Sequence, residues 1–305
     1  MSRSVIEVAN IRKTYGGTVA VDDVSFDVRD GEIFGLIGPN GAGKTTTMEC
    51  IEGLRTPDRG RIAVLGLDPS GDAKALTRRI GVQLQEAQLQ KRIKVWEAVD
   101  LWAALYDKAV DGERLLDQLG LSEKRQAWFM TLSGGQKQRL FIALALINDP
   151  EVVFLDELTT GLDPQARRAI WELVRGIRDR GKTVFLTTHL MEEAERLCDR
   201  VAIIEHGRIV DVDSPGRLVA RHCPERAVVL VTSDESAAAR LCALAGADSV
   251  EQRETRITVR GRGEDLVADV IACVSEHRIR VTDFRTEIPN LEDVFLKLTG
   301  HSIRD

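Results

Sequence analysis

The chain has 305 residues, of which 43% are hydrophobic and 30% are charged, and at roughly 150 residues per domain this length predicts about two domains. The formal net charge of −6 excludes the generally basic surface with which many proteins bind nucleic acid or acidic membranes. No run approaches the roughly 20 apolar residues that span a bilayer, and the first residues are too polar for a signal peptide. We therefore expect the chain to stay in the cytosol.

The five cysteines are scattered along the chain and include no Cys-x-x-Cys pair or histidine at metal-ligand spacing. We expect them to be reduced and mostly buried.

The first third of the chain predicts strands and one helix. Alternating apolar residues between 5 and 29 indicate two antiparallel strands joined by a turn at Gly16 and Gly17. A continuous apolar strand follows at 33–37. After a glycine-rich turn, Met48, Ile51 and Leu54 predict the apolar stripe of a helix. A strand, a glycine loop and a helix in this order are typical of a phosphate-binding site.

The predicted secondary structure changes twice in the middle of the chain. Residues 90–130 have apolar stripes at helical spacing and little strand pattern, which predicts a helical insertion at about 88–145. Beyond it, strands at 152–157, 183–189 and 200–206 alternate with helices at 164–180 and 190–198. This alternation predicts a mostly parallel, buried sheet.

Residues after about 225 predict a separate small domain. Their pattern reads strand, helix, two strands, helix, strand and a final helix at 291–299, close to a split βαβ arrangement. We expect one domain at 1–220 and an accessory domain at 225–305, with a structural, dimer-stabilising or regulatory role.

The glycine-rich turn satisfies the pattern G-x-x-x-x-G-K-[ST]. Its backbone N–H groups and the following helix N-terminus can surround phosphate oxygens, because glycine permits the turn and the close approach. Lys44 would reach the β- and γ-phosphates, and the Thr45 hydroxyl would bind Mg²⁺. An accidental glycine-rich turn is the alternative. The candidate phosphate-binding residues are Gly38, Pro39, Asn40, Gly41, Ala42, Gly43, Lys44, Thr45 and Thr46.

An apolar strand at 152–155 ends in two carboxylates, Asp156 and Glu157. Alternation along a strand predicts that they point in opposite directions and do different work. Asp156 suits the Mg²⁺ shell, usually through water, and Glu157 suits a general base acting on the attacking water. A helix cap or a surface turn is the alternative for such a pair.

The string LSGGQ places Ser133, Gly134, Gly135 and Gln136 at the start of a predicted helix. The N-terminal end of a helix attracts anions, but this one has no lysine of its own to hold them. By itself, the string is equally compatible with a capped surface helix.

Together these motifs resemble the nucleotide-binding subunit of ATP-binding cassette (ABC) transporters, over residues 5 to about 220. The resemblance implies a P-loop ABC ATPase core, a mostly parallel α/β sheet with antiparallel strands and a helical subdomain, which uses ATP and Mg²⁺. In that family LSGGQ is the signature motif, which binds the ATP held by a partner's glycine loop. The resemblance therefore implies a homodimer, or a heterodimer with a similar subunit, that encloses two ATP molecules.

Further residues take their roles only from this resemblance. Tyr15 matches the aromatic that stacks on adenine, and Gln85 matches the glutamine that senses Mg²⁺ and the membrane subunit. Asp163 matches the aspartate that crosses the dimer, and His189 matches the histidine that contacts the γ-phosphate. The expected catalytic residues are Glu157, His189 and Lys44, and the expected metal-binding residues are Thr45, Gln85 and Asp156. Leu84 and Leu158 stand where the family often has proline, and neither change removes a reactive group.

The resemblance also implies a separate transmembrane permease, so the chain would lie at the cytoplasmic face of the cell membrane, with no nucleic-acid partner. We expect the permease to dock near 85–96, where Ile93, Val95 and Trp96 are candidate contacts or, alternatively, helical core. The final string NLEDVFLKLTG resembles bacterial drug and antibiotic exporters of the daunorubicin-exporter type. Two other functions stay open: a non-transport ABC ATPase acting on nucleic acid or ribosomes, and a regulatory protein that binds ATP without hydrolysing it.

Overall fold

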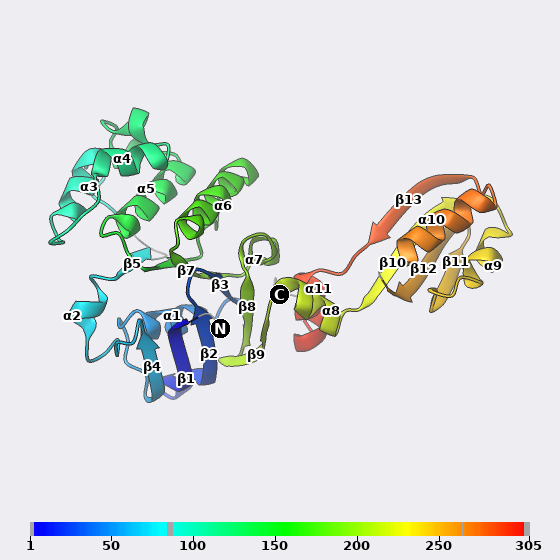
Figure 1. The fold of residues 1–305 in the computed structure, drawn as a ribbon, viewed down its shortest axis with the longest axis horizontal. Coiled ribbons are helices and arrows are strands. Elements are labelled where there is room, and N and C mark those ends of the chain that lie inside the picture. Colours follow the sequence, from blue (N-terminus) through cyan, green and yellow to red (C-terminus); the bar gives the residue numbers. More distant parts are fainter. Residues whose placement is uncertain (1–2, 84–87, 264, 302–305) are drawn as a thin grey trace. The chain divides into compact units, whose positions relative to one another are not determined.

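The computed structural model describes residues 3–83, 88–263 and 265–301. It divides into two compact units, Met1–Pro215 and Gly216–Ile303 (Figure 1). The division falls a few residues before the predicted 220–225 junction.

The first unit contains a three-stranded antiparallel sheet near its N-terminus. Its strand order is β2-β1-β4, and β1 and β2 meet at the predicted Gly16–Gly17 turn. The strands are β1 (Ser4–Tyr15), β2 (Thr18–Arg29) and β4 (Arg59–Val64).

A six-stranded sheet forms the centre of the first unit, with the order β5-β6-β7-β3-β8-β9. The first five strands run parallel and β9 is antiparallel to β8, in agreement with the mostly parallel sheet that the sequence predicts. The strands are β3 (Ile33–Ile37), β5 (Ile80–Gln83), β6 (Val152–Asp156), β7 (Thr183–Thr188), β8 (Arg200–Glu205) and β9 (Arg208–Asp213).

Helices cover this sheet. Helix α1 (Lys44–Ile51) contacts β1, β2 and β4 as well as β7, so it lies between the two sheets. Helices α5 (Gly134–Leu146), α6 (Pro164–Asp179) and α7 (Met191–Leu197) contact β5, β7 and β3. A short helix α2 (Ala73–Leu76) precedes β5. Helix α1 ends before Leu54, which is 58% exposed, so the predicted stripe is wrong at this residue.

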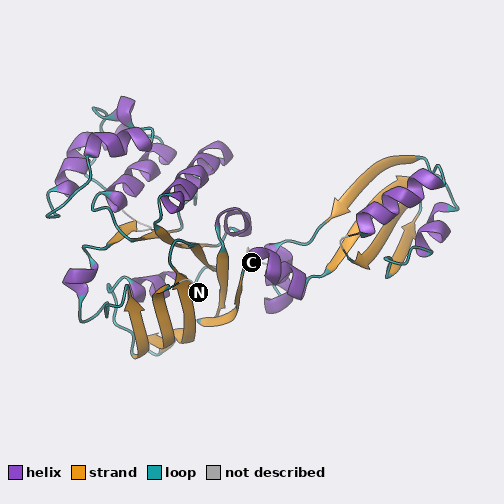
Figure 2. Cartoon of the chain, viewed as in Figure 1, coloured by secondary structure: helices purple, strands orange, loops and turns teal. Residues whose placement is uncertain are grey.

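The predicted helical insertion consists of short helices packed beside α5 (Figure 2). They are α3 (Val95–Ala103), α4 (Gly112–Gln118) and the 3₁₀ turns η1 (Ser122–Lys124) and η2 (Phe129–Thr131). Val95 is fully buried. It is therefore core, and the suggestion that it contacts a permease is wrong.

Four phenylalanines join the two sheets. Phe34 stacks on Phe26 at 5.3 Å and on Phe185 at 5.8 Å between ring centroids, and Phe154 lies 5.7 Å from Phe185. All four belong to one apolar cluster that also contains residues of β1 and α1. Burial of these rings stabilises the packing of the two sheets, because it removes apolar surface from water and because aromatic pairs prefer defined orientations.

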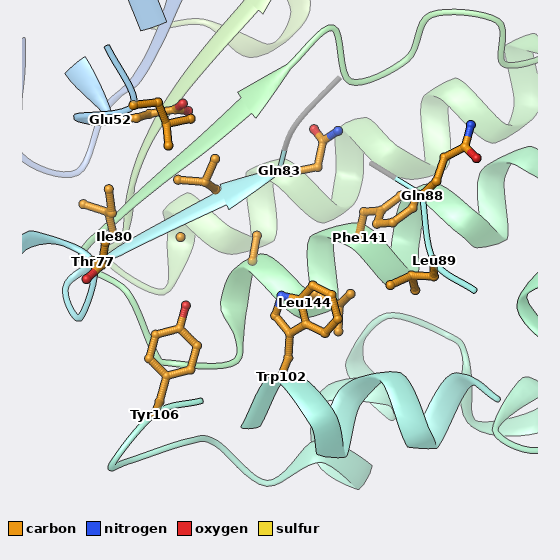
Figure 3. A pocket seen from close by; sticks show the side chains of 14 residues that line it. Glu52, Thr77, Ile80, Gln83, Gln88, Leu89, Trp102, Tyr106, Phe141 and Leu144 are labelled. Carbon is orange, nitrogen blue, oxygen red and sulfur yellow. The ribbon is translucent and has the colours of Figure 1, made fainter. Parts of the chain in front are cut away.

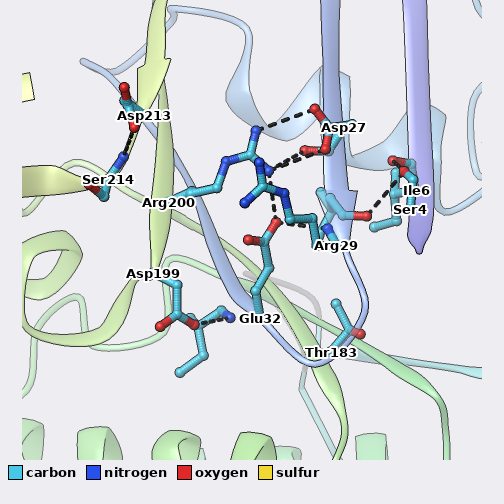
Figure 4. Close-up of polar contacts among 12 residues, drawn as sticks. Ser4, Ile6, Asp27, Arg29, Glu32, Thr183, Asp199, Arg200, Asp213 and Ser214 are labelled. Carbon is cyan, nitrogen blue, oxygen red and sulfur yellow. Dashed lines mark hydrogen bonds and ion pairs between the residues drawn. The ribbon is translucent and has the colours of Figure 1, made fainter. Parts of the chain in front are cut away.

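A charged cluster holds β2, β3 and β8 together at the edge of this core (Figure 4). The Arg200 guanidinium donates to Asp27 at 3.2 Å and to Glu32 at 3.1 Å, and it lies over the Phe34 ring. Glu32 also accepts from the Arg29 N–H. Burial raises the pKa of Glu32, and the nearby arginines partly offset that effect.

The second unit has a four-stranded antiparallel sheet with the order β11-β12-β10-β13. Helices α9 and α10 pack on it, and Val228, Leu230, Ile257 and Val259 face them in a buried cluster. This is the predicted split βαβ arrangement. The elements are α8 (Pro215–His222), β10 (Glu225–Thr232), α9 (Ala237–Cys242), β11 (Ser249–Arg253), β12 (Arg256–Arg262), α10 (Leu266–Glu276), β13 (Val281–Glu287) and α11 (Leu291–Thr299).

Among the described residues, no helix has both the length and the apolar character needed to cross a membrane.

Candidate functional site

The candidate site lies at the carboxyl ends of three neighbouring parallel strands. Strands β6, β7 and β3 are adjacent in the sheet, so Glu157, His189 and the loop that begins at Gly38 follow one another along the same edge. Ligands of open α/β sheets bind at this edge. The topology thus assembles residues that are far apart in the sequence.

The glycine loop has the backbone that a phosphate cradle needs. Gly43 has φ +100, and a Cβ there would lie 2.4 Å from the Ala20 carbonyl oxygen, so only glycine fits. Gly41 is also left-handed, and the Ala42 N–H donates to the Pro39 carbonyl at 3.2 Å. The loop therefore forms a tight turn directly before α1.

The N-terminus of α1 is available to an anion. Its N-cap residue, Gly43, has no side chain that could cap it, and its first turn contains no acidic residue. Its first N–H groups, including those of the predicted Thr45 and Thr46, have no acceptor within the helix, and the helix dipole favours negative charge there. A phosphate would supply both the acceptor and the charge.

Lys44 lies inside this cradle. It is 4% exposed, and its ammonium donates to the carbonyl oxygens of Gly38 and Pro39, each at 2.9 Å. Burial lowers its pKa, while the carboxylates of Glu157 and Asp156 act in the opposite direction. A buried ammonium held this way is positioned to bind phosphate oxygens.

Asp156 lies at the end of β6, also almost fully buried. Its carboxylate accepts hydrogen bonds from the hydroxyls of Thr187 and Thr45. Burial raises its pKa first of all, and the two hydroxyls lower it. A carboxylate beside a threonine hydroxyl is an oxygen-rich pair of the kind Mg²⁺ binds, so these residues fit the metal.

Glu157 turns away from the strand direction because its φ is +46. Its N–H donates to the Thr187 carbonyl, and its Oε1 lies 3.9 Å from the Lys44 ammonium. Both carboxylates act electrostatically on the Lys44 ammonium, although only Glu157 lies within ion-pair distance of it. Strand alternation ends at Asp156, where β6 ends.

His189 follows the end of β7 and is one-quarter exposed. Its Nδ1 lies 3.4 Å from Glu157 Oε1. The structure thus brings together the three residues that the resemblance names as catalytic, Lys44, Glu157 and His189.

The signature residues form a helix cap on an accessible surface. Ser133 Oγ accepts from the Gln136 N–H, and Gln136 Oε1 accepts from the Ser133 N–H, which is a capping box at the start of α5. Ser133 and Gly134 are exposed. In the part of the chain described, the Ser133 side chain bonds to Gln136 and not to the glycine loop.

Three other predicted residues have separate surroundings. Asp163 caps α6, accepting from the N–H groups of Gln165 and Ala166 at 3.0 and 2.9 Å. Tyr15 is 39% exposed, and the cations of Lys13 and Arg55 lie over its ring. Gln85 lies outside the described residues.

The sequence did not identify Thr187, which bonds both Asp156 and Glu157. The available signal was its position in the pair of threonines that ends a buried strand.

A second feature that the sequence missed is an apolar pocket of about 430 Å³ between β5, α5 and the helical insertion (Figure 3). Its walls include Ile80, Trp102, Tyr106, Phe141 and Leu144.

Comparisons with known proteins agree with this geometry. The sequence profile described as ABC transporter matches residues 21–160. A protein of Ralstonia nicotianae described as Nod factor export ATP-binding protein I is 40% identical over 314 residues, covering 100% of this chain and 96% of that protein. The chain belongs to the ABC transporter ATP-binding family. A protein of the same description from Bradyrhizobium diazoefficiens is 38% identical, covering 99% of both chains.

Solved structures of ABC transporter ATP-binding proteins share the fold. An ATP-binding subunit of an ABC transporter superposes with a TM-score of 0.64 at 29% identity, covering 71% of this chain and 92% of that one. A bacterial ABC transporter cassette, solved as a dimer, gives 0.61 at 28% identity, covering 68% and 98%. This ABC transporter ATP-binding protein is therefore an ATPase, and its relatives favour transport over the nucleic-acid alternative. The names of those relatives identify exporters, without the drug or daunorubicin specificity that the C-terminal string suggests.

Proposed function

We propose that the chain is the ATP-hydrolysing subunit of an exporter, and that two such subunits close around two ATP molecules and drive a separate transmembrane permease. The observation that carries this proposal is the uncapped start of α1 beside the buried Lys44, with Glu157 and His189 at the same sheet edge. ATP bound at this edge would have its negatively charged phosphates against the N-terminus of α1 and the Lys44 ammonium.

In this proposal Thr45, Asp156 and Gln85 hold Mg²⁺, which supplies positive charge to the phosphates of ATP. Glu157 accepts a proton from the attacking water, and His189 orients the Glu157 carboxylate and contacts the terminal phosphate. Thr187 acts as a positioning residue, because it holds the backbone of Glu157 and the carboxylate of Asp156. Tyr15 stacks on the adenine.

The position of the signature motif supports the proposed dimer. Ser133 and Gly134 are exposed at the start of α5, so they are free to meet the nucleotide of a second subunit. Asp163 would lie at the same interface, where its cap fixes the start of α6. A homodimer is the simpler arrangement, and a heterodimer with a similar subunit would have the same geometry.

We further propose that the permease docks in the apolar pocket of Figure 3. This places the chain at the cytoplasmic face of the membrane, as a peripheral subunit. For cargo we propose the drug or antibiotic class on the basis of NLEDVFLKLTG. Relatives named for Nod factor export support the direction of transport.

Glu157→Gln tests the catalytic part of this proposal. ATP binding is expected to persist, while phosphate release falls at least about 100-fold and a closed dimer accumulates, because the base is lost and the phosphate cradle remains. Steady-state phosphate release and sedimentation in ATP measure the two effects. Near-normal turnover would remove Glu157 from the role of base.

Two further variants serve as comparisons. Lys44→Ala is expected to lose ATP binding or hydrolysis, and an unchanged ATP titration would overturn the phosphate-binding role. Glu172→Gln, on the exposed surface of α6, is expected to hydrolyse ATP at the normal rate.

Co-purification with an integral membrane protein supports the exporter, whereas hydrolysis stimulated by nucleic acid would support the alternative function.

A further inference from the structure

Glu52 is a buried carboxyl group in the lining of the apolar pocket. It is 6% exposed, and its Oε1 has no hydrogen-bond partner among the residues that the structure describes. Burial, followed by the charges of Asp156 and Glu49, raises its pKa to about 8. An acidic group in such surroundings is costly unless a cation or a donor satisfies it.

The local backbone fixes Glu52 at the pocket. Helix α1 ends at Ile51, and Gly53 adopts the left-handed conformation at φ +80. The Leu54 N–H donates to the Glu49 carbonyl and the Gly53 N–H donates to the Cys50 carbonyl, which is a Schellman motif. A Cβ at Gly53 would meet the Pro69 carbonyl oxygen at 2.7 Å, so the turn is specific to glycine.

The pocket walls around this carboxyl group are mainly apolar and aromatic. Figure 3 shows Trp102, Tyr106, Phe141 and Leu144 with Glu52 among the side chains that line the space. The apolar surface continues outside it, because Leu54 in the lining is 58% exposed. Leu101 and Leu105, which flank Trp102 and Tyr106 in the sequence, are 52% and 69% exposed.

We propose that the pocket accepts an apolar protein segment carrying one Lys or Arg, and that its cation pairs with Glu52. This inference rests on the proposed docking of a permease and adds the chemistry by which the pocket selects its partner. The apolar walls bury the body of the segment, while the buried Glu52 Oε1, which has no hydrogen-bond partner among the described residues, accepts one positive charge. The exposed Leu54 in the lining favours a protein segment over a small organic cation.

A set of matched peptides tests the inference on the full chain. The probe is a short, fluorescein-labelled helical peptide rich in Leu and Phe with one central Lys, compared with peptides that carry norleucine or Glu at that position. Fluorescence anisotropy is measured above pH 8, where Glu52 is mainly ionised. The Lys peptide is expected to bind wild type at least about tenfold more tightly than the norleucine peptide, and the Glu peptide most weakly.

Two variants separate the inference from the docking proposal. Glu52→Gln keeps the shape and is expected to bind the Lys and norleucine peptides within about twofold of each other, while Glu172→Gln keeps the tenfold preference. Phe141→Ala removes one wall and is expected to weaken both peptides. A preference that persists in Glu52→Gln, or is absent from wild type, overturns the cation pairing.

Other outcomes are equally decisive. If Phe141→Ala weakens all three peptides equally and wild type shows no preference among them, the docking pocket stands and the role of Glu52 falls. If peptide affinity does not depend on Phe141, docking in this pocket is overturned together with the inference. If free 2-phenylethylamine binds more tightly than the Lys peptide, the pocket is a small-molecule site and the protein segment is excluded.

Discussion

Glu52→Gln is expected to make the first unit more stable than wild type at alkaline pH and nearly equal to it at acidic pH. The pKa of Glu52 is raised from 4.5 to about 8, mainly by burial. Between these values the folded state keeps a proton that the unfolded state releases. The contribution of Glu52 to wild-type stability therefore falls as the pH rises from about 4.5 to about 8 and changes no further above that range.

The size of the effect follows from the pKa. A displacement from 4.5 to about 8 corresponds to about 5 kcal/mol, at about 1.4 kcal/mol for each tenfold change. Water that reaches the ionised carboxylate reduces this figure, so we expect a difference of about 2 to 5 kcal/mol between variant and wild type at pH 9. At pH 5 the difference should be small, because both side chains are neutral in the folded state.

Urea unfolding measured by tryptophan fluorescence at several pH values tests this prediction. All four tryptophans, Trp96, Trp102, Trp128 and Trp171, belong to the first unit, so the signal reports on that unit alone. Subtracting wild type from variant cancels the titration of every other group. Glu172→Gln, at an exposed ion pair, should stay within about 1 kcal/mol of wild type throughout. A difference for Glu52→Gln that does not grow with pH would refute the burial argument.

Two further predictions concern the core and the glycine loop. Arg200→Met is expected to destabilise the first unit by about 2 to 4 kcal/mol, because Glu32 stays buried without its cation. Arg196→Met, at an exposed ion pair, should lower the free energy of unfolding by under about 1 kcal/mol. Urea unfolding compares the two variants. Equal losses would contradict the buried role of Arg200. Gly43→Ala is expected to weaken ATP binding at least about tenfold, because its Cβ would meet the Ala20 carbonyl oxygen. Gly31→Ala, also left-handed but in open space, should bind ATP normally in the same titration.

The clustering of the candidate nucleotide-binding residues at one sheet edge was largely predictable, because its signals are local. The glycine loop stands between a strand and a helix, and Asp156 and His189 come at the ends of apolar strands. The rule that ligands bind at the carboxyl ends of parallel strands then brings these segments to one edge. No contact between distant residues had to be known to propose Lys44 or Asp156.

The orientation of Glu157 was not predictable in the same way. Its left-handed backbone is supported by a hydrogen bond to the Thr187 carbonyl, which belongs to a different strand 30 residues later in the chain. Alternation describes a side chain only while the strand continues, and β6 ends one residue earlier.

The apolar pocket and the charged cluster around Arg200 could not be predicted from the sequence either, since both depend on tertiary contacts. Glu49 and Glu52 lie on consecutive turns at the end of α1, yet Glu49 pairs with Arg55 on the surface while Glu52 is buried. Likewise, Arg200 pairs with Asp27 and Glu32 across 173 and 168 residues of sequence. Composition gives no indication of which acids are buried or which cations they meet.

Helix α1 connects the candidate nucleotide site with the proposed docking pocket. It begins at Lys44 in the glycine loop and ends at the turn that places Glu52 in the pocket, and eight helical residues span about 12 Å. Asp156 also acts electrostatically on Glu52. If a cation from the permease pairs with Glu52, it stabilises a charge that interacts with the proposed Mg²⁺-binding carboxylate. Coupling between two binding events is reciprocal, so a nucleotide at one end of α1 must then change the affinity for the permease at the other.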